Sequence, residues 1–488
     1  MQLKITFNKF ETKNMRPLVF LPLLLALACG DKGLDTGETD TDADTDTAVD
    51  GDTYTFESAL SGENSVDYGG QVFRHLLVDD MKARFAIQQS RLVDDNWVPD
   101  AGDARDEILF YLDFDDSIGG ALEHGKADIT VSSTYGDIGS GKNLFGKMAG
   151  NDEKGQHKVW ADDFVGWNEA AVTSPESLVR HWLDMLDQQA VAWGQGNVPL
   201  GPDGAPVPAV YVTPEGLDLQ QLTDKFVRGA VAFSQGTDDY LDNDTDDHGL
   251  NSDHTAVKEG KNYTALEHVW DEGFGYFGAS RDYGLRTDAD IKAAAAFDTN
   301  GDGDIDLYSE YSWGHSVNAA KRDLGANVPT DYTAQAWMGF WNGRALLAET
   351  AGTELTTPQM DELVGYRDEA ILAWENAIAA TVVHYINATL QDMNQFGTDD
   401  YRFADHAKHW SELKGFALVL QFNPHSPLSD ARFLEFHELV GDAPVLHTAD
   451  TGDTDRYRDD LVAARTILGE AYGYDAENLG DDDGENGW

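Results

Sequence analysis

Apolar side chains recur at intervals of three and four residues along most of the chain beyond residue 54. This spacing gathers them on one face of an α-helix, whereas a half-buried strand alternates every second residue. The clearest stripe comprises Leu363, Tyr366, Ala370, Trp374, Ile378, Thr381 and Tyr385. The pattern predicts helices at 72–88, 177–192, 217–235, 285–297, 308–323, 332–349, 359–394 and 456–472. We therefore expect a mostly α protein built of helix bundles.

Three of these helices are predicted to begin at a hydroxyl residue that precedes a proline: Ser174, Thr213 and Thr357. A hydroxyl at the N-cap accepts a hydrogen bond from a first-turn N–H group, and proline at the first helical position has no N–H to leave unpaired. Each of these hydroxyl–proline pairs therefore predicts a helix start.

Two stretches depart from the helical pattern. Residues from about 98 to 170 are predicted to form a loop-rich insertion with short extended pieces at 108–114 and 128–136. Residues 476–488 form an acidic tail that we expect to be mobile. The helical domain is accordingly predicted to span residues 54–475.

The N-terminus has the pattern of a secretion signal. A basic region precedes a short apolar run at 18–28 that is too short to span a bilayer. The run ends at Cys29, the only cysteine of the chain, in a setting that resembles a bacterial lipobox. The resemblance implies that residues 1–28 are a lipoprotein signal peptide and that Cys29 is lipidated.

Residues 29–53 are acidic and low in complexity, and they predict a disordered tether. No other stretch reaches the roughly 18 to 20 apolar residues that a membrane helix requires. We expect the protein to be held at a membrane by its N-terminal lipid. Its location would be the bacterial cell envelope, at the periplasmic face or the cell surface.

The composition is strongly acidic, with 88 Asp and Glu residues against 34 Lys and Arg residues and a net charge of −54. Binding of nucleic acid depends on a basic surface, so this class of partner is excluded. Cation binding, a saline habitat and simple solubility are all compatible with the charge.

Residues 298–310 read DTNGDGDIDLYSE and resemble an EF-hand calcium loop. Oxygen-bearing side chains stand at loop positions 1, 3 and 5, a glycine at 6 and an apolar residue at 8. The predicted ligands are Asp298, Asn300, Asp302, Asp304 through its carbonyl, Asp306 and Glu310. The loop departs from the pattern at position 12, where Ser309 stands and the acid follows one residue later. We expect Ca²⁺ in a structural role, with Mg²⁺ or weak Ca²⁺ binding as the alternative.

A second set of candidate ligands lies in two helical stretches. His268 and Glu272 are four residues apart on one helix face, with Asp271 beside them, and His409 and Glu412 follow a similar pattern. Imidazole and carboxylate groups on one face can hold iron or another transition metal. The alternative is that the acids are solvated and the aromatic neighbours belong to the core.

The pentapeptide GTDDY occurs at 236–240 and at 397–401, upstream of the two histidine-containing stretches. The repeat hints at an internal duplication, in which two pseudo-symmetric helical halves face each other.

No nucleophilic or zinc-protease motif is present, so a non-enzymatic protein is expected.

Four stretches resemble a bacterial lipoprotein family of unassigned function: EHVWDEGFGYFG, SEYSWGHSVNAAKRD, WENAIAATVVHYIN and HAKHWSELKGFALVLQFNP. That family is similar in architecture to imelysin, which is all-helical with two bundle-like halves and an H-x-x-E metal motif. The resemblance places the motif on His268, with Asp271 where the Glu should be and Glu272 one residue later. It implies a role in iron or haem acquisition beside an outer-membrane receptor or another uptake lipoprotein.

The expected function is therefore that of a lipid-anchored, calcium-stabilised protein that binds a metal or a metal complex during uptake. One alternative is a surface interaction or adhesion lipoprotein in which calcium only stabilises the fold. A second alternative is a metal-dependent hydrolase.

Overall fold

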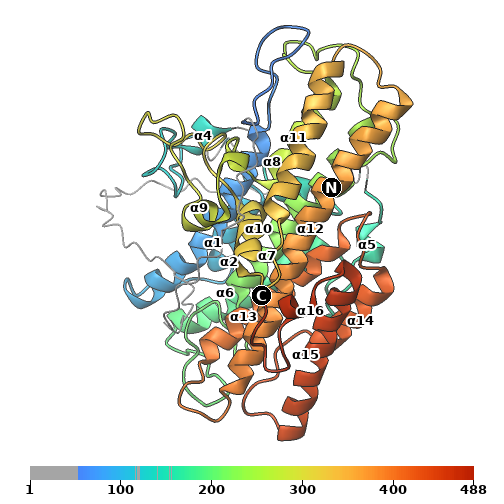
Figure 1. Cartoon of the computed structure of the whole chain (residues 1–488). Helices are drawn as coiled ribbons and strands as arrows, with labels where there is room; N and C mark the ends of the chain where they lie inside the picture. Colours follow the sequence, from blue (N-terminus) through green and yellow to red (C-terminus); the bar gives the residue numbers. More distant parts are fainter. Residues whose placement is uncertain (1–52, 116, 118–120, 140, 153, 155) are drawn as a thin grey trace. The chain divides into compact units, whose positions relative to one another are not determined.

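The computed structural model describes residues 53–115, 117, 121–139, 141–152, 154 and 156–488, and it is mostly helical (Figure 1). The α-helices are α1 (Gly69–Val93), α2 (Asp103–Leu112), α4 (Tyr135–Ile138), α5 (Trp160–Asp163), α6 (Pro175–Gly194), α7 (Leu219–Arg228), α8 (Ala265–Phe277), α9 (Asp288–Ala293), α10 (Gly314–Gly325), α11 (Tyr332–Thr350), α12 (Thr357–Asn394), α13 (Phe403–Ala417), α14 (Asp430–Val440), α15 (Thr451–Tyr472) and α16 (Ala476–Leu479). Short 3₁₀ turns are η1 (Phe145–Lys147), η4 (Gly249–Asn251), η5 (Tyr283–Leu285) and η6 (Leu418–Gln421), and π-helical turns are η2 (Gly229–Phe233) and η3 (Gln235–Tyr240). Extended backbone in the described ranges forms only isolated bridges and no strand. The prediction of a mostly α fold is confirmed.

Cα packing divides the chain into Met1–Thr45 and Asp46–Trp488, and all described residues belong to the second unit. The predicted signal peptide, Cys29 and residues 29–52 of the predicted tether lie outside the described residues. None of the helices in the described part combines the length and apolar character that crossing a membrane requires.

The long helix α12 lies in the hydrophobic core. All residues from 373 to 383 are buried, so this stretch is covered on every side rather than along a single stripe. α11 packs along it on one side and α13 packs against it as well (Figure 1). The Trp374 ring lies at the centre and donates its N–H to His315 Nδ1 at 2.9 Å.

The helix starts follow the predicted chemistry at one of three places and are one residue away at a second. Ser174 caps α6 with its side chain, as predicted. The cap of α12 is Thr356, one residue before the predicted Thr357. The start predicted at Thr213 is wrong, because α7 begins after Asp218 and the preceding residues form a turn in which Thr213 N–H donates to Leu217 O.

The extended pieces predicted in the insertion are also wrong. Residues 108–114 fall largely in α2, whose inward face carries Ala104, Ile108 and Leu112 at four-residue intervals. This face packs on α1 and α6, so tertiary burial selects the helix over the strand that the aromatic and branched residues favoured. Residues 128–136 contribute a single bridge, between Glu123 and Thr134.

The acidic tail is packed against the helices rather than mobile. Trp488 is 4% exposed, and its ring N–H donates to Arg322 O at 2.9 Å. Asn387 Nδ2, on α12, donates to Trp488 O at 3.0 Å. Burial of one tryptophan therefore outweighs the acidic composition that predicted mobility.

Candidate metal-binding sites

Helix α8 carries the first set of predicted ligands. A capping box starts it: Thr264 Oγ1 accepts from Glu267 N at 3.1 Å, and Glu267 Oε2 accepts from Thr264 N at 2.8 Å. The helix ends at Gly278, whose φ of 86° is in the left-handed region that glycine adopts without strain. His268 and Glu272 therefore lie one turn apart on the same face.

His268 is held by three contacts. Its Nδ1 lies 3.0 Å from Asp67 O, and its ring stacks on Tyr263 at 4.4 Å between centroids. Its Nε2 lies 3.7 Å from Glu272 Oε2, and both side chains are about one fifth exposed, at 19% and 18%. Glu272 Oε1 accepts from Gln71 Nε2 at 2.9 Å. The structure thus brings an imidazole nitrogen and a carboxylate together at the protein surface.

Asp271 lies on the adjacent, buried face of α8. Its Oδ1 accepts from Arg344 Nε at 2.8 Å and from the Tyr54 hydroxyl at 3.0 Å. The same guanidinium donates through Nη1 to Glu267 Oε1 at 2.9 Å and through Nη2 to Ser65 Oγ at 2.6 Å. Arg344, Glu267 and Asp271 have no exposed surface. We call these three residues the Arg344 triad, and the Asp271 carboxylate belongs to it rather than to the surface around His268.

Helix α13 carries the second set. His409 Nδ1 lies 2.7 Å from Asp392 Oδ2, and this carboxylate raises the pKa of His409 although burial alone would lower it. Glu412 is buried, and its Oε1 lies 3.5 Å from Lys225 Nζ. His406, one turn before His409, is buried against the Tyr401 hydroxyl, and burial lowers its pKa to about 3.

The two sets do not form one cluster. Helix α8 packs on α1, α11 and η3, whereas α13 packs on α7 and α12. In the described part of the chain, no group of three or more His, Cys, Asp and Glu side chains is arranged to hold a metal ion. Each predicted pair is therefore considered by itself.

The 298–310 loop curls around the side chain of its first residue. Asp298 Oδ1 accepts from Gly301 N at 2.8 Å and Asp302 N at 3.1 Å, and Oδ2 accepts from Gly303 N at 2.9 Å. Gly303, at the sixth loop position, has a φ of 92°, which only glycine adopts readily. Asn300 Oδ1 accepts from Asp302 N at 2.8 Å. The backbone therefore makes the sharp turn that an EF-hand-like loop needs.

Glu310 joins the two arms of this loop. It is 4% exposed, and its Oε1 accepts from Thr299 N at 3.1 Å and Asn300 N at 3.3 Å. Its Oε2 accepts from Asp306 N at 3.0 Å. The acid at the thirteenth position thus crosses the loop and bonds to backbone N–H groups.

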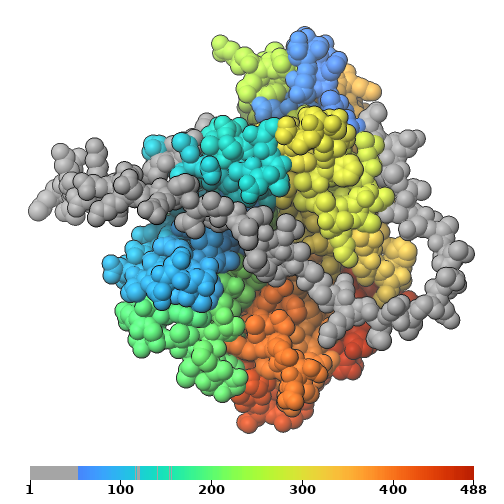
Figure 2. All heavy atoms as spheres, turned by 90° about the vertical axis from the view of Figure 1, so that its left-hand side faces the viewer, coloured from blue at the N-terminus to red at the C-terminus, as the bar shows by residue number. Residues whose placement is uncertain are grey.

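The residues that follow anchor the loop to the helices. Tyr68 donates its hydroxyl to Tyr308 O at 2.7 Å, and Arg281 N donates to Ser309 O at 2.8 Å. The Tyr308 hydroxyl bonds to Ile138 O. Figure 2 shows the yellow segment that contains the loop beside the cyan segment that contains α4. The helix predicted at 285–297 is shorter in the structure, as α9, and the helix predicted at 308–323 begins only at Gly314, as α10. Between them an Ala296–Tyr311 bridge closes the loop.

A buried charge network on α7 was not predicted from the sequence. Asp224 is buried, with Lys82 Nζ at 2.8 Å, Lys225 Nζ at 2.9 Å and Arg228 Nη2 at 3.1 Å. Burial alone would raise the pKa of Asp224, but these three cations hold it well below its usual range. The i, i+4 spacing of Asp224 and Arg228 was the only local signal, and it is common on solvated helices.

Asp218, the N-cap of α7, lies beside this network. Its Oδ1 accepts from Gln221 N at 3.0 Å, and its own N–H donates to Ser411 Oγ at 2.7 Å. Burial, with a contribution from the Glu412 carboxylate, raises the pKa of Asp218 to about 7.

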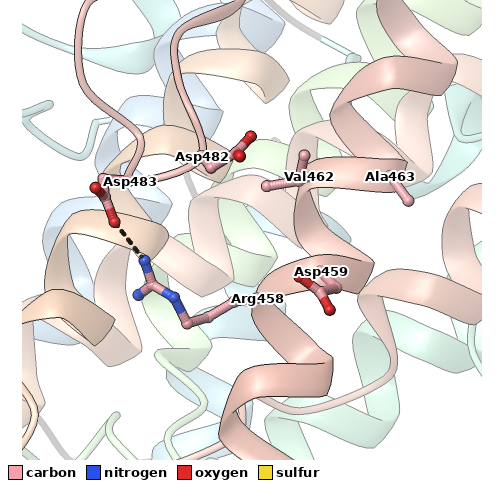
Figure 3. Close-up of a pocket in the computed structure, with 6 residues that line it drawn as sticks. All are labelled: Arg458, Asp459, Val462, Ala463, Asp482 and Asp483. Carbon is pink, nitrogen blue, oxygen red and sulfur yellow. Dashed lines mark hydrogen bonds and ion pairs between the residues drawn. The ribbon is translucent and has the colours of Figure 1, made fainter.

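A surface hollow of about 370 Å³ lies between α15 and the C-terminal loop (Figure 3). It is lined by Arg458, Asp459, Val462, Ala463, Asp482 and Asp483. Arg458 spans part of it and pairs with Asp483 at 2.9 Å. None of the predicted ligands lines this hollow.

Comparison with known families gives one partial match. A model described as "Domain of unknown function (DUF4856)" matches residues 179–297. The matched segment runs from α6 through α9, so it includes His268 and Glu272 and ends just before the 298–310 loop. This agrees with the expectation of a domain family of unassigned function. Comparisons with curated proteins and with solved structures find no match.

The Arg344 triad predicts a large loss of stability on removal of its cation. Arg344→Ala leaves two buried carboxylates without their partner, and we expect the free energy of unfolding to fall by about 3–5 kcal/mol. Urea denaturation measures the free energy of unfolding of the variant and the wild type. Arg456→Ala is the control, because Arg456 is 66% exposed in a surface pair with Asp453 and should change stability by less than about 0.5 kcal/mol. Equal effects of the two variants would contradict the role assigned to the triad.

Asp218 predicts a specific pH dependence. Its pKa in the folded state is above the unfolded value, so ionisation destabilises the fold as the pH rises from about 4 to about 7. Asp218→Asn keeps the capping oxygen and removes the charge. We expect the variant to gain stability relative to wild type across this range, up to about 4 kcal/mol at pH 8. The check is urea denaturation of both proteins between pH 4 and pH 8, and a difference that is constant with pH would refute the assignment.

Proposed function

We propose that this chain is a lipid-anchored protein of the bacterial cell envelope that binds Ca²⁺ in the 298–310 loop and a transition metal or metal complex at α8. The calcium assignment is the part with the most direct support. It rests on the Asp298 carboxylate, around which three successive loop N–H groups turn, and on the left-handed Gly303.

The loop offers the donor types of a calcium site, although among the described residues its carboxylates are not gathered into one metal-holding cluster. Asp298, Asn300 and Asp302 supply side-chain oxygens, Asp304 supplies a carbonyl, and Asp306 supplies a further carboxylate. Oxygen donors of this kind are those that Ca²⁺ prefers. Glu310 is bonded to backbone N–H groups of the loop, so we assign it to shaping the loop. When bound, Ca²⁺ would neutralise these acids and stabilise the segment that carries Tyr308 and Ser309.

Calcium should therefore stabilise the fold. We expect saturating Ca²⁺ to raise Tm by about 5 °C over chelator-treated protein, because an ion that binds only the folded state adds its binding free energy to stability. Asp302→Asn keeps the acceptor that bonds Asp304 N but removes one ligand charge, so its calcium affinity should fall about tenfold. Thermal unfolding and calcium titration calorimetry measure the two effects.

The matched control is Asp246→Asn, since Asp246 is an exposed aspartate in the acidic loop after η3. It should leave calcium affinity unchanged. An Asp302→Asn protein that binds calcium like wild type would exclude this loop as the site.

The proposed transition-metal site rests on the orientation of His268. Its Nδ1 is held by a backbone carbonyl, and its Nε2 faces a carboxylate 3.7 Å away. Metal-binding histidines are characteristically oriented by such an acceptor on the other ring nitrogen. With metal–ligand bonds of about 2.0–2.2 Å, both atoms can contact the same ion. Gln71, bonded to the other oxygen of Glu272, would orient the carboxylate.

Two protein ligands leave the other coordination positions to the ligands of a metal complex. This supports a protein that captures an iron complex or haem during uptake, with an outer-membrane receptor or another uptake lipoprotein as its partner.

His409, whose Nδ1 faces Asp392, is oriented in the same way on α13. We propose it, with Glu412, as a second, separate contact. The two-halved architecture similar to imelysin is part of this proposal.

The metal site predicts selective loss of binding. Wild-type protein freed of metal should take up iron or another transition metal, and His268→Ala should lower the affinity at least about tenfold. Equilibrium dialysis followed by elemental analysis measures the uptake. His181→Ala, a half-buried histidine on α6, is the control. Uptake of calcium alone would favour the interaction or adhesion protein, and turnover of a substrate on repletion would favour the hydrolase.

A further inference from the structure

A small cavity, partly open to the surface, lies between α1, α8 and the π-helical turn η2. Its volume of about 10 Å³ is that of a single water-sized particle. Three polar side chains line it: Arg74 from α1, Arg228 at the end of α7, and Tyr276 from α8. The remaining lining side chains are His75 and apolar groups of α1, η2 and the segment before η1.

Two of these side chains have donors without a partner. Arg228 gives Nη2 to Asp79 at 2.8 Å and to Asp224 at 3.1 Å, but its Nη1 has no hydrogen-bond partner in the described part of the chain. The Tyr276 hydroxyl likewise has none there. Arg228 is 7% exposed and Tyr276 is 0% exposed. A buried charged donor without a partner is costly, so the arrangement calls for an acceptor in the cavity.

Arg74 adds a second buried positive charge. It is 7% exposed and donates to the backbone, through Nε to Asn143 O at 2.9 Å and through Nη1 to Gly70 O at 3.3 Å. Within the described ranges it forms no ion pair with a carboxylate. Buried charges are normally paired with the opposite charge, so the Arg74 side of the cavity lacks a counter-ion.

The other lining groups provide neither an acceptor nor a competing anion. Burial lowers the pKa of His75 to about 4, which leaves its ring neutral at pH 7, and its Nε2 is bonded to Gly275 O at 3.0 Å. Burial raises the pKa of Tyr276, so its hydroxyl keeps its proton and can donate. The site therefore offers two unpartnered donors, Arg228 Nη1 and the Tyr276 hydroxyl, beside the positive charge of Arg74.

We propose that this cavity binds one small monatomic anion, of the chloride or bromide type, which joins α1, α8 and the α7–η2 junction. A halide can accept from Arg228 Nη1 and the Tyr276 hydroxyl, and it supplies the counter-charge that Arg74 lacks. A smaller water molecule would also fit, but its two hydrogens would need acceptors of their own. In a chain of net charge −54, such an anion site depends on Arg74, since Arg228 is already paired with Asp79 and Asp224.

The test uses crystals of the protein soaked in sodium bromide and the anomalous scattering of bromine. We expect a bromide peak inside the cavity, within hydrogen-bond distance of Arg228 Nη1 and Tyr276 Oη. Density for a water without anomalous signal, or bromide at surface sites alone, overturns the proposal. This test needs no variant, and it is independent of the calcium and transition-metal assignments.

Stability in solution gives a second readout. At equal ionic strength and saturating calcium, sodium chloride should raise Tm by about 2 °C over sodium gluconate, whose anion is too large to enter. Tyr276→Phe should lose at least half of this increment. The control is Tyr283→Phe, which removes a buried hydroxyl that bonds Ser316 O at 2.7 Å outside the cavity. It should lower Tm in both salts and keep the increment, and an increment that persists in Tyr276→Phe counts against the cavity.

Discussion

A guanidinium with no access to water must find its counter-charges inside the protein, and Arg344 imposes this requirement on three segments at once. It joins α11 to Glu267 and Asp271 on α8 and to Ser65 in the segment before α1. Because Glu267 and Asp271 are four residues apart, both face inward only in one rotation of α8. That rotation turns His268 and Glu272 outward, where their side chains reach solvent. The proposed metal contact thus depends on a salt bridge on the adjacent face of the same helix.

The same balance of charge recurs elsewhere in the molecule. Arg228 is neutralised by Asp79 and Asp224, whereas Arg74 lacks a carboxylate among the described residues. The opposite imbalance occurs in the 298–310 loop, whose Asp302 and Asp304 are exposed and whose carboxylates form no salt bridge in the described part of the chain. Local charge that the protein leaves unbalanced is a physical reason for binding an ion. The same argument supports both the proposed cation at the loop and the proposed anion in the cavity.

Helical periodicity and capping chemistry predicted most of the helices, because both act over a few residues. Ser174 is an example, since its hydroxyl and the following proline define the start of α6 locally. Residues 108–114 look like a strand, and only their packing on α1 and α6 makes them helical. Two i, i+4 pairs stand on α8, Glu267 with Asp271 and His268 with Glu272. The first pair is buried because it binds Arg344, which is 73 residues from Asp271. Local reasoning therefore found the candidate site and could not assign Asp271 to its salt bridge.

The account depends most on the metal content of the folded protein. The most direct measurement is elemental analysis of the full chain purified without chelators, combined with its protein concentration. We predict one equivalent of calcium per chain. We also predict iron or another transition metal, at no more than two equivalents, because His268 and His409 are two separate contacts. Protein that carries no calcium and takes none up at millimolar concentration would contradict the calcium loop, and with it the proposal that this acidic chain is stabilised by the ion.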